Sequence, residues 1–416
     1  MPTPPTNSIR TIRAHRIWTS TTGSPGCRIP CCTPSPPDSV PRAGHSAAET
    51  RPVPGGHVSS TVGPRNAITD VAGVLVGHHQ ELDADATLGS GAATGCTVVR
   101  VPGGATAAVD VRGGGPGTRE TDLLDPGHTV RQVNAVLLTG GSAYGLAAAD
   151  GVMRWLEEHG EGIPMDPSDP SRVVPIVPGA VIFDLPVGAW DIRPTAEFGY
   201  RAAHVAAPTF ERGSVGAGVG ARAGAVKGGI GTASVYFTDG PAAGHTVGAL
   251  VVANPVGSVF DPRTGLPWGA GTDGPEWFGL APASAEQLSR ANALPVKGTV
   301  LNTTIGVVAT DAALDPAACR RLAVTAHDGL ARAVRPAHSP LDGDTLFALA
   351  TGTVATDSNI PLPPAFPADL LLLDELCTAA AVCVERAIVD AVLHAGPVAG
   401  IPTYRELFGP GSAPQR

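Results

Sequence analysis

The sequence predicts an α/β fold, and two observations support this class. Short apolar segments rich in Val, Ile and Thr alternate with segments whose apolar residues recur at a helical period. Several expected helices are also bounded by capping residues, glycine or proline. The expected strand segments are residues 68–78, 96–110, 135–138, 173–183, 246–253, 304–310 and 345–351. Such alternation is typical of a β-sheet covered by helices.

Local signals define several of these elements more closely. Residues 96–110 are expected to form a hairpin that turns at Pro102-Gly103-Gly104. A helix is expected to begin at a Ser142 cap and to stop at Gly160. Another has Asp315 at its cap and Pro316 at its first position. The last helix covers about residues 369–395.

Composition narrows the class of function. The 416 residues carry a formal charge of −9, with 16% charged and 43% hydrophobic residues, which leaves no basic surface for nucleic acid. No apolar run approaches the ~18 residues of a membrane span. The seven cysteines form no C-x-x-C pair, and neither they nor the histidines show metal-site spacing. We therefore expect a protein of the reducing cytoplasm, without cofactor, metal, membrane or nucleic-acid partner.

The N-terminal segment differs from the rest of the chain. Its first sixty residues hold 11 of the 41 prolines, with no sustained strand or helix period and no apolar core of a secretory signal. Residues 1–62 are expected to be a disordered, proline-rich tail. The globular part follows.

The sequence Asn302-Thr303-Thr304 stands at the start of an apolar strand segment and suggests chemistry. If the bond between Asn302 and Thr303 is cut, Thr303 gains a free α-amine beside its hydroxyl. An α-amine titrates near ~7.7–8.0 and can accept the hydroxyl proton, so one residue would supply nucleophile and base. The simpler alternative is a polar entry to a buried strand.

Other motifs carry weaker signals. Gly216-x-Gly218 resembles a dinucleotide fingerprint but lacks the strand before it and the helix after it. The run from Gly113 to Gly115 would form an anion-binding nest or a tight turn around a crowded site. The sequence leaves open a Ser-His-Asp triad assembled in space.

The histidines and the two lysines of the chain lead to different expectations. His78, His79, His327 and His338 are interpreted as surface or core-edge residues. Only two of the 28 basic residues are lysines, Lys227 and Lys297. A lysine kept in so arginine-rich a chain is a candidate for a role that needs an adjustable pKa.

Seven segments, in order, resemble the L-aminopeptidase/D-esterase family of self-processing hydrolases, which includes β-aminopeptidases and is related to nylon-oligomer hydrolases. The resemblance covers about residues 66–407. Its segments are residues 110–114, 138–146, 215–218, 227–234, 252–257, 302–305 and 342–345. Leu301-Asn302 before the candidate nucleophile is closer to the nylon-oligomer type than to relatives with glycine there.

The resemblance implies an αββα sandwich like that of N-terminal-nucleophile hydrolases. It implies one precursor cut into two associated subunits, residues 63–302 and residues 303–416. Carried over by position, Thr303 is the nucleophile and Asn254 helps to hold the oxyanion. Tyr144 lines the same pocket, and Lys227 corresponds to the catalytic lysine. Asp342 and Asp344 orient the surroundings of the nucleophile.

The function that follows is a self-processing aminopeptidase or amidohydrolase. Its substrates would be small peptides, amino-acid amides or esters, and the cleaved heterodimers would assemble into a homo-oligomer, as in the family. Two alternatives stay open at this point. One is an acyltransferase of the ornithine acetyltransferase type, and the other is a non-catalytic assembly protein that remains uncleaved.

Overall fold

The computed structural model describes residues 60–295, 302–355 and 362–409. Contacts place the chain from His57 onward in one compact unit. Most of the expected tail lies outside the described residues, but its last three, Ser60–Val62, form strand β1. The boundary between Asn302 and Thr303 falls inside the compact unit.

A ten-stranded mixed sheet runs through this unit. Nine strands follow one path in the order β1, β11, β12, β13, β14, β3, β5, β8, β4, and β2 pairs with β3. β13 and β14 are parallel, as are β5 and β8, and the other pairs are antiparallel. The bounds are β2 Leu75–Leu82, β3 Ala93–Val111, β4 Thr118–Arg119, β5 Gln132–Thr139, β8 Gly179–Val181, β11 Gly229–Phe237, β12 Thr246–Ala253, β13 Ile305–Ala312 and β14 Thr345–Val354. Two small pairs join β6 Ile163–Pro164 to β7 Val173–Val174 and β9 Arg222–Ala223 to β10 Val226–Lys227.

The long strand β3 replaces the expected hairpin at Pro102-Gly103-Gly104, so that prediction was wrong. Gly103 and Gly104 have φ values of 86° and 82°, and the register of β3 against β5 shifts between Arg100 and Ala105. These residues therefore form a bulge inside one strand rather than a chain reversal. The first part of β3 pairs with β2 and the second part with β14, which joins the two halves of the sheet.

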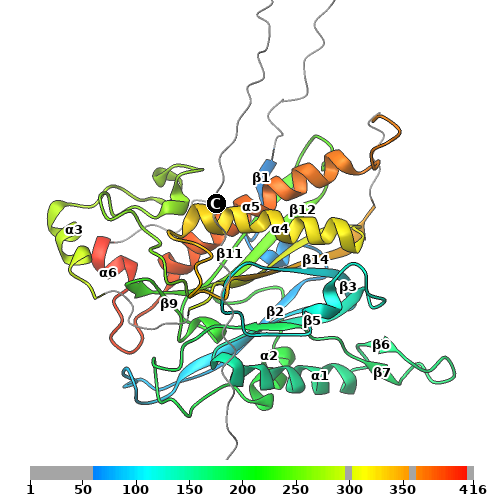
Figure 1. Ribbon diagram of the computed structural model, residues 1–416, viewed down its shortest axis with the longest axis horizontal. Helices are drawn as coiled ribbons and strands as arrows, with labels where there is room; N and C mark the ends of the chain where they lie inside the picture. The colour runs from blue at the N-terminus through cyan, green and yellow to red at the C-terminus, as the bar shows by residue number, and fades with distance from the viewer. Residues whose placement is uncertain (1–59, 296–301, 356–361, 410–416) are drawn as a thin grey trace, which may run out of the picture. The chain divides into compact units, whose positions relative to one another are not determined.

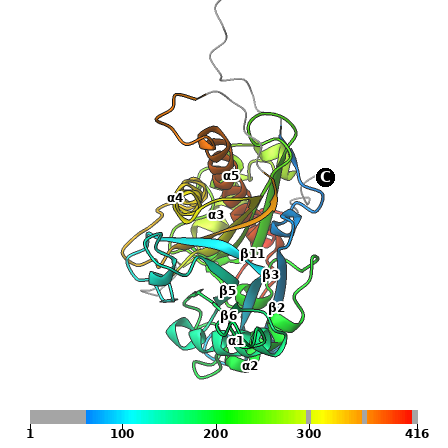
Figure 2. The ribbon, with the colours of Figure 1, turned by 90° about the vertical axis from the view of Figure 1, so that its right-hand side faces the viewer.

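Helices cover both halves (Figure 1). α4 (Pro316–Ala333) and α5 (Leu370–His394) pack on the side of β11 to β14, whereas α1 (Ala148–Glu158) and α2 (Ala196–His204) pack on the side of β2, β3 and β5. Figure 2 shows the helix pairs on opposite sides of the two sheet halves. Two short helices are α3 (Ala285–Asn292) and α6 (Tyr404–Phe408). None of the helices in the described part of the chain is long and apolar enough to cross a membrane.

Alternating side chains divide the apolar core into layers. In β13, Ile305 and Val307 join a cluster between the sheet halves, whereas Val308 joins the cluster beneath α4 and α5. In β5, Leu138 belongs to the central cluster and Leu137 to the cluster with α1 and α2. Because each strand buries both of its faces, the layers are helix, sheet, sheet and helix. The predicted αββα sandwich is confirmed.

Helix caps match the sequence in one case and differ in another. The side chain of Asp315 accepts a hydrogen bond from the Ala318 amide at 2.8 Å and begins α4 as expected. Ser142 does not cap α1; it has φ of 52° and opens a 3-10 helix, Ser142–Ala147, that precedes α1. The structure thus places a strained turn, not a simple cap, after β5.

Candidate active site

Thr303 lies at the entrance of β13, and its side chain is buried. Its hydroxyl donates a hydrogen bond to the carbonyl oxygen of Asn302, the residue before it. The same carbonyl oxygen accepts the Gly343 amide at 2.9 Å. The Thr303 amide donates to the backbone oxygen of Asn254 at 3.1 Å. The hydroxyl therefore lies against a peptide carbonyl that already receives an N–H donor.

The sheet explains this placement. β13 runs parallel to β14, and Asn302 forms a parallel bridge to Asp342 before the two strands begin. The Asn302 amide donates to the oxygen of Leu341 at 2.9 Å, and the Thr345 amide donates to the oxygen of Thr304 at 3.1 Å. The loop that enters β14 is thus held alongside the residues that enter β13.

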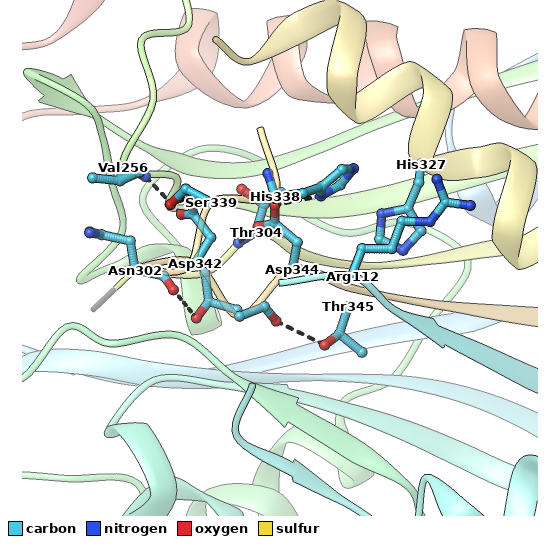
Figure 3. Close-up of polar contacts among 12 residues, drawn as sticks. Arg112, Val256, Asn302, Thr304, His327, His338, Ser339, Asp342, Asp344 and Thr345 are labelled. Atoms are coloured by element: carbon cyan, nitrogen blue, oxygen red, sulfur yellow. Dashed lines mark hydrogen bonds and ion pairs between the residues drawn. The ribbon is translucent and has the colours of Figure 1, made fainter. Parts of the chain in front are cut away.

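Asp342 is fully buried and lies beside Asn302 and Ser339 (Figure 3). Its carboxylate accepts the Val256 amide at 3.0 Å and the Ser339 hydroxyl at 2.8 Å. Burial raises the pKa of the Asp342 carboxyl, and the charge of Asp344 adds to this shift. The two carboxylates are therefore electrostatically linked.

Asp344 connects the loop to the candidate nucleophile. One carboxylate oxygen accepts the Thr304 amide at 2.9 Å, and the other accepts the His338 amide at 3.0 Å and lies 2.8 Å from His338 Nδ1. Because Thr304 follows Thr303, Asp344 fixes the backbone that carries the hydroxyl.

The glycine run that begins at Gly113 packs on this loop. The Gly115 amide donates to the oxygen of Asp342 at 2.8 Å, and the Gly113 amide donates to the oxygen of Asp344 at 3.2 Å. A Cβ atom on Gly113 would lie 2.2 Å from the Asp344 nitrogen. Of the two interpretations offered by the sequence, the structure therefore favours a tight turn around a crowded site.

Asn254 joins the site through its backbone oxygen, which accepts the Thr303 amide. Its side-chain oxygen accepts the Arg222 amide at 2.9 Å, and its Nδ2 lies 3.5 Å from the oxygen of Phe183. The amide group of Asn254 is thus fixed next to the chain entering β13, at full burial.

Lys227 is also fully buried, close to the end of the strand that leads to Asn254. Its Nζ donates to the backbone oxygens of Gly218 and Gly228, both at 2.7 Å. A Cβ atom on Gly228 would lie 1.9 Å from the oxygen of Ala253, which shows how closely this turn abuts β12. Burial lowers the pKa of Lys227 to about 7, against the opposing effect of the Asp184 carboxylate.

The described contacts bring together Thr303, Asn254, Asp342 and Asp344, but none of them joins Lys227 or Tyr144 to the Thr303 hydroxyl. Tyr144 lies in the 3-10 helix before α1 with 58% of its surface exposed. The guanidinium of Arg193 lies over its ring at 3.9 Å.

Comparison with known proteins assigns the family. The model of Peptidase family S58 matches residues 66–405. The chain belongs to peptidase family S58. An uncharacterized aminopeptidase of Mycobacterium tuberculosis is 59% identical over 351 residues, which are 83% of this chain and 99% of the relative. This member of family S58 is therefore a hydrolase of the aminopeptidase and amidohydrolase class.

More distant relatives agree with the family S58 assignment. A 6-aminohexanoate-oligomer endohydrolase of Agromyces is 31% identical over 309 residues, covering 73% of this chain and 80% of the relative. The solved structure of a Burkholderia β-aminopeptidase matches with a TM-score of 0.62 and 26% identity, covering 84% of this chain and 94% of that chain. An L-aminopeptidase D-Ala-esterase/amidase of Ochrobactrum anthropi, described as a variant of the Ntn hydrolase fold, matches with a TM-score of 0.58 and 24% identity, covering 85% and 93%.

The Gly216-x-Gly218 motif of this S58 peptidase does not have the geometry of a dinucleotide site. Gly216–Gly218 forms a three-residue 3-10 helix followed by β9, which is not the helix that a dinucleotide site needs. Across the described ranges 60–295, 302–355 and 362–409, no group of three or more His, Cys, Asp or Glu residues is arranged to hold a metal ion.

Three residues close to Asp344 or to its partner His338 were not predicted as site residues from the sequence. Gly343 supplies the amide that faces the Asn302 carbonyl, and His338 contacts Asp344. His327, interpreted as a surface or core-edge residue, is fully buried in α4. The sequence signals for Gly343 and His338 were the place of Gly343 within the family-like segment 342–345 and the position of His338 six residues before Asp344.

Proposed function

We propose that Thr303 cleaves the bond between itself and Asn302, and that it then hydrolyses small peptides, amino-acid amides or esters as an N-terminal nucleophile. The observation that supports this most directly is the contact between the Thr303 hydroxyl and the Asn302 carbonyl oxygen. Attack needs a nucleophile held beside a polarised carbonyl group.

Self-cleavage takes place in two steps. Thr303 Oγ bonds to the carbonyl carbon of Asn302, the C–N bond breaks, and the hydroxyl proton passes to the nitrogen. Water then hydrolyses the resulting ester, which leaves a carboxylate on Asn302 and restores the hydroxyl. The Gly343 amide, 2.9 Å from the Asn302 oxygen, is placed to stabilise the negative charge that develops there.

Turnover reuses the same atoms. The new α-amine of Thr303 takes the hydroxyl proton, Oγ attacks the substrate carbonyl, and the amine or alcohol of the substrate leaves with that proton. Water then releases the acyl group from Oγ. The backbone oxygen of Asn254, which accepts the Thr303 amide at 3.1 Å, would hold the α-amine after cleavage.

The remaining site residues have supporting roles in this proposal. The Asn254 amide helps to hold the oxyanion and Tyr144 lines the substrate pocket. Asp342 and Asp344 position the backbone around Thr303. Lys227, with its lowered pKa, supplies an amine that is partly neutral near pH ~7 and so can exchange a proton.

The relatives suggest the substrate class. Enzymes named for 6-aminohexanoate oligomers and for β-aminopeptidase activity share this fold at 31% and 26% identity. We infer amide substrates with a free amino end, cytoplasmic action, and an oligomer of cleaved heterodimers. Membership of a peptidase family favours hydrolysis over the acyltransferase alternative.

The test is the intact mass of the purified protein under denaturing conditions, beside Thr303→Ala and Thr303→Ser variants. The wild type should yield a fragment that begins at Thr303. The serine variant should also yield it, since serine keeps the hydroxyl, and the alanine variant should stay whole. A wild-type chain that remains whole would overturn the proposal and favour the assembly protein.

A further inference from the structure

Two histidine rings lie in contact next to Asp344. His338 belongs to the loop before Asp344, and its side chain is 20% exposed. His327 belongs to α4 and is fully buried. Their ring centroids are 4.8 Å apart with an interplanar angle of 70° (Figure 3). The mechanism described above uses neither ring.

Hydrogen-bond partners indicate which ring nitrogens carry hydrogen. His338 Nδ1 lies 2.8 Å from a carboxylate oxygen of Asp344, so it donates. His327 Nε2 lies 3.0 Å from the backbone oxygen of Asp110, so it also donates. In the neutral rings this leaves His338 Nε2 and His327 Nδ1 as acceptors. Within the described part of the chain, both are buried without a hydrogen-bond partner.

A buried acceptor without a donor destabilises the folded protein, because it has lost its hydrogen bond to water and gained none in return. One added proton removes both costs where the two lone pairs face each other. A proton on His338 Nε2 turns that atom into a donor, and His327 Nδ1 can accept from it directly or through one water. The two unpartnered nitrogens belong to rings in direct contact, with centroids 4.8 Å apart.

The surrounding charges favour protonation of His338 over protonation of His327. Asp342 and Asp344 lie in the same loop as His338, and among the described residues neither carboxylate forms an ion pair with arginine or lysine. On the other side, Asp110 lies 3.7 Å from His327 Nε2 but is already paired with Arg112 at 2.6 Å and Arg320 at 3.5 Å. The uncompensated negative charge is therefore next to His338.

We propose that His338 and His327 together bind one proton and thereby hold Asp344 in place beside the entrance of β13. His338 is a positioning residue, since it acts through Asp344 on the Thr304 amide and so on Thr303. This role rests on the proposed function of Thr303.

The pair holds one proton and not two. Burial lowers the pKa of His327 to about 4, and the charge of His338 adds to that effect. When this proton leaves with rising pH, Asp344 loses the cationic neighbour that the described residues give it, and both ring acceptors lose their donor. Self-cleavage should therefore slow as the proton leaves.

Two measurements test this. In the first, the rate of self-cleavage is followed from pH 5 to 8 in freshly purified precursor. His338→Asn keeps an N–H donor toward Asp344 but cannot titrate, so its profile should lack the decline seen in the wild type. His394→Asn is the matched control, because His394 also contacts an aspartate, Asp390 at 3.0 Å, but makes no described contact with Asp342 or Asp344. Its profile should match the wild type.

The second measurement is independent of cleavage. Ring nitrogens of ¹⁵N-histidine-labelled wild-type protein are titrated by NMR, with His338 assigned from its absence in His338→Asn or, if that variant does not fold, from its shift in His327→Gln. The His338 ring should carry hydrogen on both nitrogens at the acidic end of the titration, and the doubly protonated fraction should be smaller in His327→Phe, which lacks the acceptor. A His338 ring that stays neutral throughout would overturn the pair, whether or not the chain cleaves itself. Cleavage profiles that are the same in His338→Asn and wild type would overturn its positioning role.

Discussion

Replacing Gly343 by alanine should slow self-cleavage strongly, because this residue lies directly against the reacting atoms. A Cβ atom at position 343 would lie 2.8 Å from Thr303 Oγ, 2.6 Å from the oxygen of Gly115 and 3.0 Å from the Cα of Pro116. The Gly115 and Pro116 contacts are backbone atoms and cannot swing aside. The Thr303 hydroxyl is the group that can rotate, and rotation removes it from the Asn302 carbonyl.

Gly343→Ala should affect both the folding stability and the rate of self-cleavage. Overpacking of this kind costs about 1–3 kcal/mol of folding stability. Displacing the Gly343 amide from the Asn302 oxygen removes an oxyanion donor, which is worth about 10²–10³ in rate. We therefore expect self-cleavage to slow by at least about 10²-fold while most of the protein stays folded.

The assay is the fraction of cleaved chain against time, by denaturing mass spectrometry, with urea unfolding in parallel. Gly396→Ala is the matched control, since a Cβ atom there would meet nothing within 4 Å. It should cleave at the wild-type rate. A folded Gly343→Ala variant that also cleaves at the wild-type rate would refute the placement of the Gly343 amide in the reaction.

Two further substitutions test the pKa of Lys227 and the N-terminal cap of helix α4. The pKa of Lys227 is about 7 in the folded protein and ~10.4 in an unfolded chain, so the unfolded chain holds the extra proton between these values. Wild-type stability should therefore rise with pH across that window, and Lys227→Met should lack this rise in urea unfolding; parallel pH profiles would contradict the buried, weakly basic lysine. Asp315→Ala removes the acceptor of the Ala318 amide at the start of α4 and should cost about 0.5–2 kcal/mol in thermal unfolding. Self-cleavage should be unchanged in this variant, and a large loss would mean that the first turn of α4 affects the site.

Local signals explain what the sequence predicted well. The strand expected at residues 246–253 is β12, with the same bounds. The helix after Asp315 begins where the cap and the proline place it. The long C-terminal helix runs from Leu370 to His394, within one residue of the expected range at each end. Each of these depends on neighbours in the chain, which the sequence shows directly.

The bulge in β3 depended on partners distant in the chain. Pro102-Gly103-Gly104 is a good turn sequence, and the local signal favoured a hairpin. In the folded protein β5 and β14 pair with the residues after it, so continuing the strand satisfies more backbone groups than reversing it. The same pairing joins the two sheet halves.

The sequence was sufficient to predict Thr303 as a candidate, the α/β class, the start of α4 and both ends of α5, because these depend on residue types and spacing among neighbours in the chain. The contacts that give Thr303 its chemistry were decided by tertiary structure. Gly343 contacts Asn302 and Asp344 contacts Thr304 because β13 and β14 are parallel neighbours, although about forty residues separate them in the chain. His338 is in the same loop and contacts Asp344. His327 joins them from α4 only because that helix packs over the sheet. Which side chains meet is set by burial of the apolar layers, and that is a property of the whole chain.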